Sequence, residues 1–221
     1  MHELNIFIHV FTGVLALLVG IVSYASQKGG KRHVLSGRIF LGLMAFVLVT
    51  AAIGVLFYRD RPFLALLTIQ SFYMAATGYR ATFYKTNGPG RIDLLLVLGL
   101  VGCGLAFVWS LHQANILWSN AVVYYTLGAL FTVGFYDVLR IAKVLNWQNA
   151  WVPEHFMKMT SAYGALFSAG LGTVLPDLGP YTQIIPAMVA TWLLIGVAWR
   201  YRKLFRGSSQ IGQPYSTNRT T

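Results

Sequence analysis

The sequence has few charged residues, few acidic residues and almost no cysteine. Only 10% of its 221 residues are charged and 56% are hydrophobic, whereas soluble domains carry about 25% charged residues. Little of the folded surface can therefore face water. The one cysteine, Cys103, lies inside an apolar run, where we expect it to pack as a small buried side chain. A disulfide framework is excluded, and so is a zinc site built from several thiolates.

Basic residues are the exception to this scarcity. The chain has 17 lysines and arginines against 6 acidic residues, which gives a formal net charge of +11. Such an excess is also found in nucleic-acid-binding proteins, but there the basic residues form one patch. Here they lie between apolar runs, a distribution typical of membrane topology. We therefore expect the lipid bilayer as the main partner, and no nucleic acid.

Long apolar runs predict an all-α, polytopic membrane helix bundle. A helix that crosses the hydrocarbon core needs about 20 mostly apolar residues. The first run has no basic segment before it and is too long for the apolar part of a signal peptide, so we expect it to be a span. The bundle is predicted over residues 1–206, followed by a flexible polar tail over 207–221. The seven predicted spans are 4–24, 37–57, 62–80, 92–111, 120–139, 156–175 and 182–199.

The positions of the basic residues predict the orientation of the bundle. Apart from Arg59 and Arg61, every lysine and arginine falls on alternate connectors or on the C-terminal tail. Loops on the cytoplasmic side are enriched in these residues. We therefore expect a multi-pass protein of the inner (cytoplasmic) membrane, with its N-terminus outside and its C-terminus in the cytoplasm.

Four histidines near the ends of the predicted spans are candidate cofactor ligands. His9 and His112 are expected near the outer face, and His33 and His155 near the cytoplasmic face. Two b-type haems need two such pairs, because each iron takes two axial imidazoles from the protein. The most specific hypothesis from the sequence is therefore a haem b-binding membrane redox protein that takes part in electron transport.

A second interpretation places a single divalent metal ion near the cytoplasmic face. It requires the second, fifth and sixth spans to be neighbours, so that His33, His155 and Asp137 can meet and bind the ion and an activated water. No tight motif such as HExxH supports it. The alternative is an ion pair of Asp137 with Arg38 or Lys158. The residues that would form this polar cluster are His33, Arg38, Asp137, Glu154, His155 and Lys158.

Other observations leave the function open. Gln70, Tyr73 and Thr77 share one face of the third span, which predicts either a cavity lining or, more commonly, hydrogen bonds to a neighbouring helix. A chain without any cofactor remains an alternative, either a small-solute carrier or an accessory subunit that binds other membrane proteins. Whether the protein is an enzyme stays undecided at this stage.

Four segments of the sequence carry a resemblance to a known family. They are His9-x3-Gly13, Ala16-Leu17-Leu18-x-Gly20, Lys28-Gly29-Gly30-x2-His33-x3-Gly37-Arg38-Ile39-Phe40 and Glu154-His155-x-Met157-Lys158. With them the chain resembles an uncharacterised family of prokaryotic integral membrane proteins, catalogued as a domain of unknown function. The resemblance covers most of the chain and is most specific in the first 45 residues. It implies no particular reaction, but it does imply that His9, His33 and His155 are the positions to test first, surrounded by Gly13, Gly37 and Arg38.

Overall fold

The computed structural model describes residues 1–58, 62–84, 88–114, 120–145 and 150–179, together with isolated residues between 181 and 196. Over these ranges the chain is all-helical. A single 3-10 turn, η1 (Pro176–Leu178), follows the last of the long helices. The long helices are α1 (His2–Ala25), α2 (Lys31–Phe57), α3 (Pro62–Tyr84), α4 (Arg91–Ala114), α5 (Asn120–Ile141) and α6 (Trp151–Val174).

The first six predicted runs are helices, and some begin earlier than predicted. α2 begins at Lys31 instead of residue 37, and α6 begins at Trp151 instead of residue 156. The first turn of α2 is basic and that of α6 contains Pro153 and Glu154, so a search for apolar runs leaves both out although the backbone is already helical. Most of the predicted seventh span, 182–199, and the whole tail, 207–221, lie outside the described residues.

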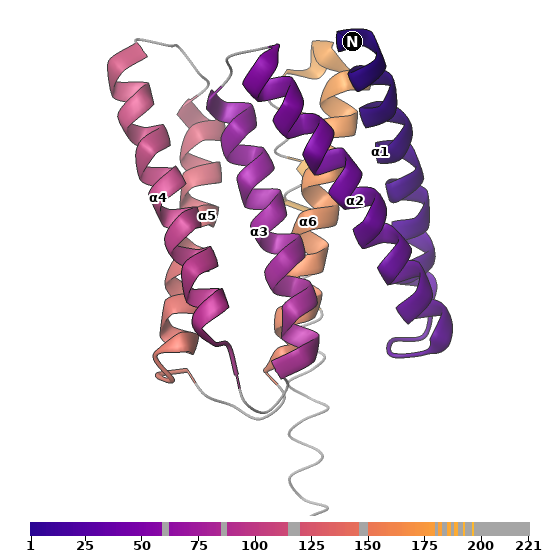
Figure 1. Ribbon diagram of the computed structural model, residues 1–221, viewed down its shortest axis with the longest axis vertical. Coiled ribbons are helices and arrows are strands. Elements are labelled where there is room, and N and C mark those ends of the chain that lie inside the picture. The colour runs from indigo at the N-terminus through magenta and orange to yellow at the C-terminus, as the bar shows by residue number, and fades with distance from the viewer. Residues whose placement is uncertain are drawn as a thin grey trace, which may run out of the picture.

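The helices form an up-and-down bundle (Figure 1). α3 lies in the middle, α4 and α5 lie on one side of it, and α1, α2 and α6 lie on the other; the most extensive contacts are between α1 and α2 and between α3 and α6. Successive helices run in opposite directions. The α1–α2, α3–α4 and α5–α6 connections therefore share one end, here called the basic end because Lys28, Arg91 and Lys143 lie there.

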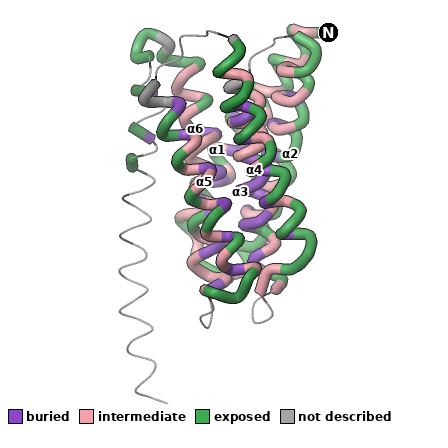
Figure 2. The backbone as a smooth tube through the Cα atoms, turned by 90° about the vertical axis from the view of Figure 1, so that its left-hand side faces the viewer, coloured by how far each residue is buried: buried purple, intermediate pink, exposed green. Residues whose placement is uncertain are grey.

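The surface of the bundle is apolar. Within the described residues, three helical segments are long and apolar enough to cross a membrane: His2–Ala25, Lys31–Phe57 and Arg91–Gln113. On them Leu18, Phe46 and Leu95 are 56%, 61% and 69% exposed. Figure 2 shows exposed residues along the outer faces of the helices and buried residues between them. Such a surface is consistent with a helical membrane bundle, because lipid tails solvate it and water does not.

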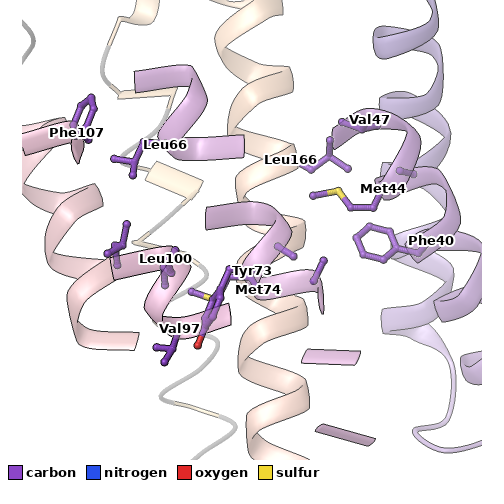
Figure 3. Close-up of a cluster of buried hydrophobic side chains, with 14 of the residues drawn as sticks. Phe40, Met44, Val47, Leu66, Tyr73, Met74, Val97, Leu100, Phe107 and Leu166 are labelled. Atoms are coloured by element: carbon purple, nitrogen blue, oxygen red, sulfur yellow. The ribbon is translucent and has the colours of Figure 1, made fainter. Parts of the chain in front are cut away.

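The apolar interior is one cluster of buried side chains that extends across the bundle (Figure 3). On one side, Phe40, Met44 and Val47 of α2 pack near Leu166 of α6. On the other side, the side chains of α3 pack against those of α4. The labelled members on this second side are Leu66, Tyr73, Met74, Val97, Leu100 and Phe107.

The contact between α1 and α6 requires a glycine. A Cβ atom built on Gly20 would lie 2.4 Å from Cε2 of Tyr163, and the Tyr163 hydroxyl donates a hydrogen bond to the Leu17 carbonyl at 3.2 Å. Gly20→Ala should therefore lower the free energy of unfolding by about 1–3 kcal/mol, because the aromatic ring has to move. Gly42→Ala is the matched control, because nothing lies within 4 Å of its Cβ position. Thermal unfolding in detergent compares the two variants, and equal melting temperatures would contradict this close contact.

Candidate functional site

Two of the predicted ligand histidines meet at the basic end. His33 lies in the first turn of α2 and His155 in the first turns of α6, and their ring centres are 6.4 Å apart with the ring planes at 85°. Nδ1 of His33 lies 3.0 Å from the carbonyl oxygen of Ser23, at the end of α1. Nδ1 of His155 lies 2.8 Å from the carbonyl oxygen of Gly78, in α3. Four helices thus fix the two rings.

These contacts determine which nitrogen of each ring is free. A carbonyl oxygen only accepts hydrogen bonds, so Nδ1 carries the proton and donates it in both histidines. In a neutral imidazole the other nitrogen, Nε2, then holds a lone pair. Histidines that bind metals almost always have this arrangement, with the remote N–H donated to a carbonyl or carboxylate. Each ring is therefore held through Nδ1 and leaves its Nε2 lone pair available to a ligand.

Aromatic and basic side chains adjoin the histidine pair in the sequence. The ring of Tyr24, next to Ser23, contacts Phe156, next to His155, with ring centres 6.3 Å apart, and the Tyr24 hydroxyl donates to Thr160. Lys28 donates from Nζ to the Tyr24 carbonyl at 2.8 Å and interacts electrostatically with His155. Partial burial lowers the pKa of Lys28 below its ordinary value. A cation of the α1–α2 connection therefore acts on His155.

Asp137 does not join the histidines. Its Oδ1 accepts from Nζ of Lys158 at 2.8 Å, and its Oδ2 accepts from the hydroxyl of Tyr73. The predicted ion pair of Asp137 with Lys158 is thus confirmed. Of the predicted polar face of the third span, Tyr73 bonds to a neighbouring helix, whereas the Thr77 hydroxyl bonds within α3. Among the described residues no group of three histidine, cysteine or acidic side chains could hold a metal ion. The predicted set of His33, His155 and Asp137 is therefore not assembled.

A second buried ion pair lies closer to the basic end. Nε of Arg140 donates to Oε1 of Glu154, and the hydroxyl of Tyr136 donates to the same oxygen at 2.9 Å. Arg140 also donates to the carbonyl of Leu145 at 2.5 Å. Glu154 is only 2% exposed, and its other oxygen, Oε2, has no hydrogen-bond partner among the described residues. Sequence reasoning placed Glu154 in the polar cluster but missed Arg140.

The spacing of the charges contained a signal for both pairs. Asp137 and Arg140 lie three residues apart on α5, and Glu154 and Lys158 lie four apart on α6. Both spacings put two charges on one helix face. Because the two helices are antiparallel, the acidic residue of each then meets the basic residue of the other.

A third ion pair joins α3 to α4. Arg80 donates from Nε and Nη2 to the two carboxylate oxygens of Asp93, at 2.8 and 2.9 Å, and the backbone N–H of Gly90 donates to the same carboxylate. Asp93 is buried, whereas the Arg80 side chain is 31% exposed. This pair therefore connects the interior with the solvent at the basic end.

The other two candidate histidines lie apart. His9 bonds to α2: its Nδ1 lies 2.9 Å from Oγ1 of Thr50 and 3.2 Å from the carbonyl of Val47. His112 lies in the last turn of α4, which is on the opposite side of the bundle from α1 (Figure 1). The structure therefore brings together the predicted pair at the basic end and does not bring together the predicted pair at the other end.

No protein-family model, curated protein or solved structure matches the chain. The resemblance to the uncharacterised membrane-protein family therefore stays a prediction that depends on the quoted residues alone.

Proposed function

We propose that the chain is a multi-pass protein of the cytoplasmic membrane, with seven spans, its N-terminus outside and its basic end in the cytoplasm. Three helices have the length and composition of spans. Their antiparallel packing with α3, α5 and α6 supports a crossing by those helices too. The placement of basic connectors at one end supports the orientation.

We further propose that His33 and His155 bind one haem b, which makes the protein a membrane electron carrier. The observation that carries this proposal is the approach of the two rings, each anchored through Nδ1. If His33 and His155 held one metal ion through Nε2, each nitrogen about 2 Å from it, their ring centres would lie up to about 6 Å apart. The observed 6.4 Å agrees with that arrangement.

The donor set also fits haem. The porphyrin supplies four nitrogens, so the protein needs to supply only two axial ligands, and here two imidazoles come from different helices. A structural zinc site, in contrast, usually takes all four ligands from the protein. When bound, the haem supplies one-electron transfer, while the protein sets its environment.

The surrounding residues have separate roles in this proposal. The carbonyls of Ser23 and Gly78 hold the two rings in orientation and make each Nε2 a better donor. Tyr24 and Phe156, which adjoin Ser23 and His155 in the sequence, pack against each other and hold α1 against α6 beside the pair. Lys28, an exposed residue whose ammonium group donates to the Tyr24 carbonyl, would balance negative charge on the ligand. Because His9 and His112 lie apart, we expect a single haem per chain.

An absorption spectrum tests the proposed function. The protein is expressed with an adequate haem supply, purified in detergent, and measured as oxidised and then dithionite-reduced. A Soret band and sharp reduced bands of a b-type haem are the expected result, since both axial positions are filled by imidazole. A featureless spectrum would contradict haem binding.

The same histidine pair also supports a second candidate, a site for a single divalent metal ion, because two lone-pair nitrogens bind such ions too. Metal analysis of the same preparation separates the two candidates. A featureless spectrum together with a stoichiometric metal that is lost in His33→Ala would favour the metal site. A preparation with neither haem nor metal, in which histidine substitutions reduce only folding, would favour a carrier or an accessory subunit.

A further inference from the structure

We propose that α3, α4, α5 and α6 enclose a water-filled path that opens at the basic end, reaches Gln70, and is closed beyond it by Leu66 and Phe107. Its ligand is water and the protons that water carries. The path involves none of the four candidate histidines, so it stands independently of the haem proposal.

The path follows one face of α3. Gln70, Tyr73, Thr77 and Arg80 succeed one another at steps of three, four and three residues, which places them on one side of the helix. Tyr73 and Thr77 are 2% and 1% exposed, so this polar face is turned into the bundle. At about 1.5 Å per residue the row extends about 15 Å inward from Arg80, roughly half of a hydrocarbon core.

Among the described residues, three ion pairs link the helices around this row. Asp137 and Lys158 meet Tyr73, and Asp93 interacts electrostatically with Lys158. Tyr84, at the end of α3, interacts with Glu154 in the same way. The pairs are thus one electrostatically coupled cluster across four helices. Buried ionisable groups in membrane helices are costly, and where they occur they mark ion and proton pathways.

Two buried acceptors, one in this row and one on α6, lack a donor among the described residues. Glu154 Oε2 and Gln70 Oε1 are both buried, and neither has a hydrogen-bond partner among the described residues. Glu154 cannot turn to relieve this, because its Oε1 is already held by Arg140 and Tyr136. Flipping the Gln70 amide would only replace a buried acceptor by a buried donor. Each such group costs about 1–3 kcal/mol when unsatisfied, so bound water stabilises both.

Charge balance indicates why the occupant is water and not an ion. Among the described residues the cluster contains three cations and three carboxylates, each matched in an ion pair. An added ion would leave a net charge in the interior, where it is poorly solvated. A neutral molecule that both donates and accepts hydrogen bonds leaves no net charge. Buried waters typically make about three hydrogen bonds to buried polar groups that lack other partners.

The far end of the row is apolar. Leu66 and Phe107 are 2% and 4% exposed, and in Figure 3 they lie beyond Tyr73, on the side away from its hydroxyl. Neither side chain can bind water. The path is therefore a half-channel, and a proton that enters from the basic end stops near Gln70.

Hydroxyl-radical footprinting by X-ray radiolysis tests this proposal on the full-length protein in lipid nanodiscs. Radicals formed from bound water oxidise the side chains next to it. We expect oxidation of Tyr73 in spite of its burial. Met44 is the matched control: it is also 2% exposed and is intrinsically more reactive, but it lies in the apolar part between α2 and α6. Oxidation of Tyr73 no greater than that of Met44 would overturn the proposal.

A variant locates the inner end of the path. Gln70→Leu removes the unpartnered acceptor at the inner end, so oxidation of Tyr73 should fall, while Tyr136, beside Glu154, keeps its own oxidation. Thr68→Val is the control, because the Thr68 hydroxyl bonds to the Leu64 carbonyl within α3. It should change the oxidation of neither Tyr73 nor Tyr136. Unchanged oxidation of Tyr73 in Gln70→Leu would show that no water is held at Gln70 and would overturn the proposed extent of the path.

Discussion

Replacing His155 by alanine should abolish the low-spin b-type spectrum, and replacing His33 should do the same. Each variant removes one of the two nitrogens that fill the axial positions, and no other histidine ring contacts the pair among the described residues. The double variant should contain no haem at all. Pyridine-haemochrome content and the reduced spectrum of purified protein measure both effects.

His112→Ala and His9→Ala are the controls for these variants. His112 lies on α4, on the other side of the bundle, and His9 bonds to α2 at the opposite end. His9→Ala should cost about 0.5–1.5 kcal/mol of stability through its lost hydrogen bond, with the spectrum unchanged. A loss of haem in either control equal to the loss in His155→Ala would contradict the assignment of the ligands.

Asp137→Ala should lower the free energy of unfolding by about 3–5 kcal/mol, because it leaves the Lys158 ammonium buried and unpaired. Lys158 is 5% exposed and bonds to Asp137 at 2.8 Å, while Tyr73 also loses its acceptor. Denaturation of the detergent-solubilised protein, followed by circular dichroism, measures the change.

Two further variants show whether the effect comes from the unpaired charge. Asp137→Leu combined with Lys158→Met removes both charges, and it should recover much of the lost stability, since apolar replacements of buried pairs are often neutral. Arg91→Ala, at an exposed position of the same end, should change stability by less than about 0.5 kcal/mol. A double variant as unstable as Asp137→Ala would show that the ion pair itself contributes the stability.

The helices of this protein were predictable from its sequence because lipid-facing and buried helix positions both require apolar side chains. α1 through α6 coincide with the first six predicted runs. The beginnings of α2 and α6 were not predictable in the same way. Hydropathy cannot distinguish a polar first turn that is already helical from a connector, as at Lys31 and Glu154.

The same reasoning explains why only one histidine pair was found together. Topology fixes the depth of a residue along the bundle, so His33 and His155 were expected at one end and His9 and His112 at the other. It says nothing of which helices are neighbours. That depends on side-chain packing around α3, which places α4 away from α1 and separates His9 from His112. The pairs of Arg140 with Glu154 and of Arg80 with Asp93 depend on neighbours as well.

The central claim is that two perpendicular imidazoles, His33 and His155, hold one haem iron. Low-temperature electron paramagnetic resonance of the oxidised wild-type protein tests it most directly, because the signal reports both the axial ligands and the angle between their planes. With ring planes at 85°, the account predicts one highly anisotropic low-spin ferric signal. A high-spin ferric signal, or no haem iron signal in protein produced with adequate haem, would contradict it.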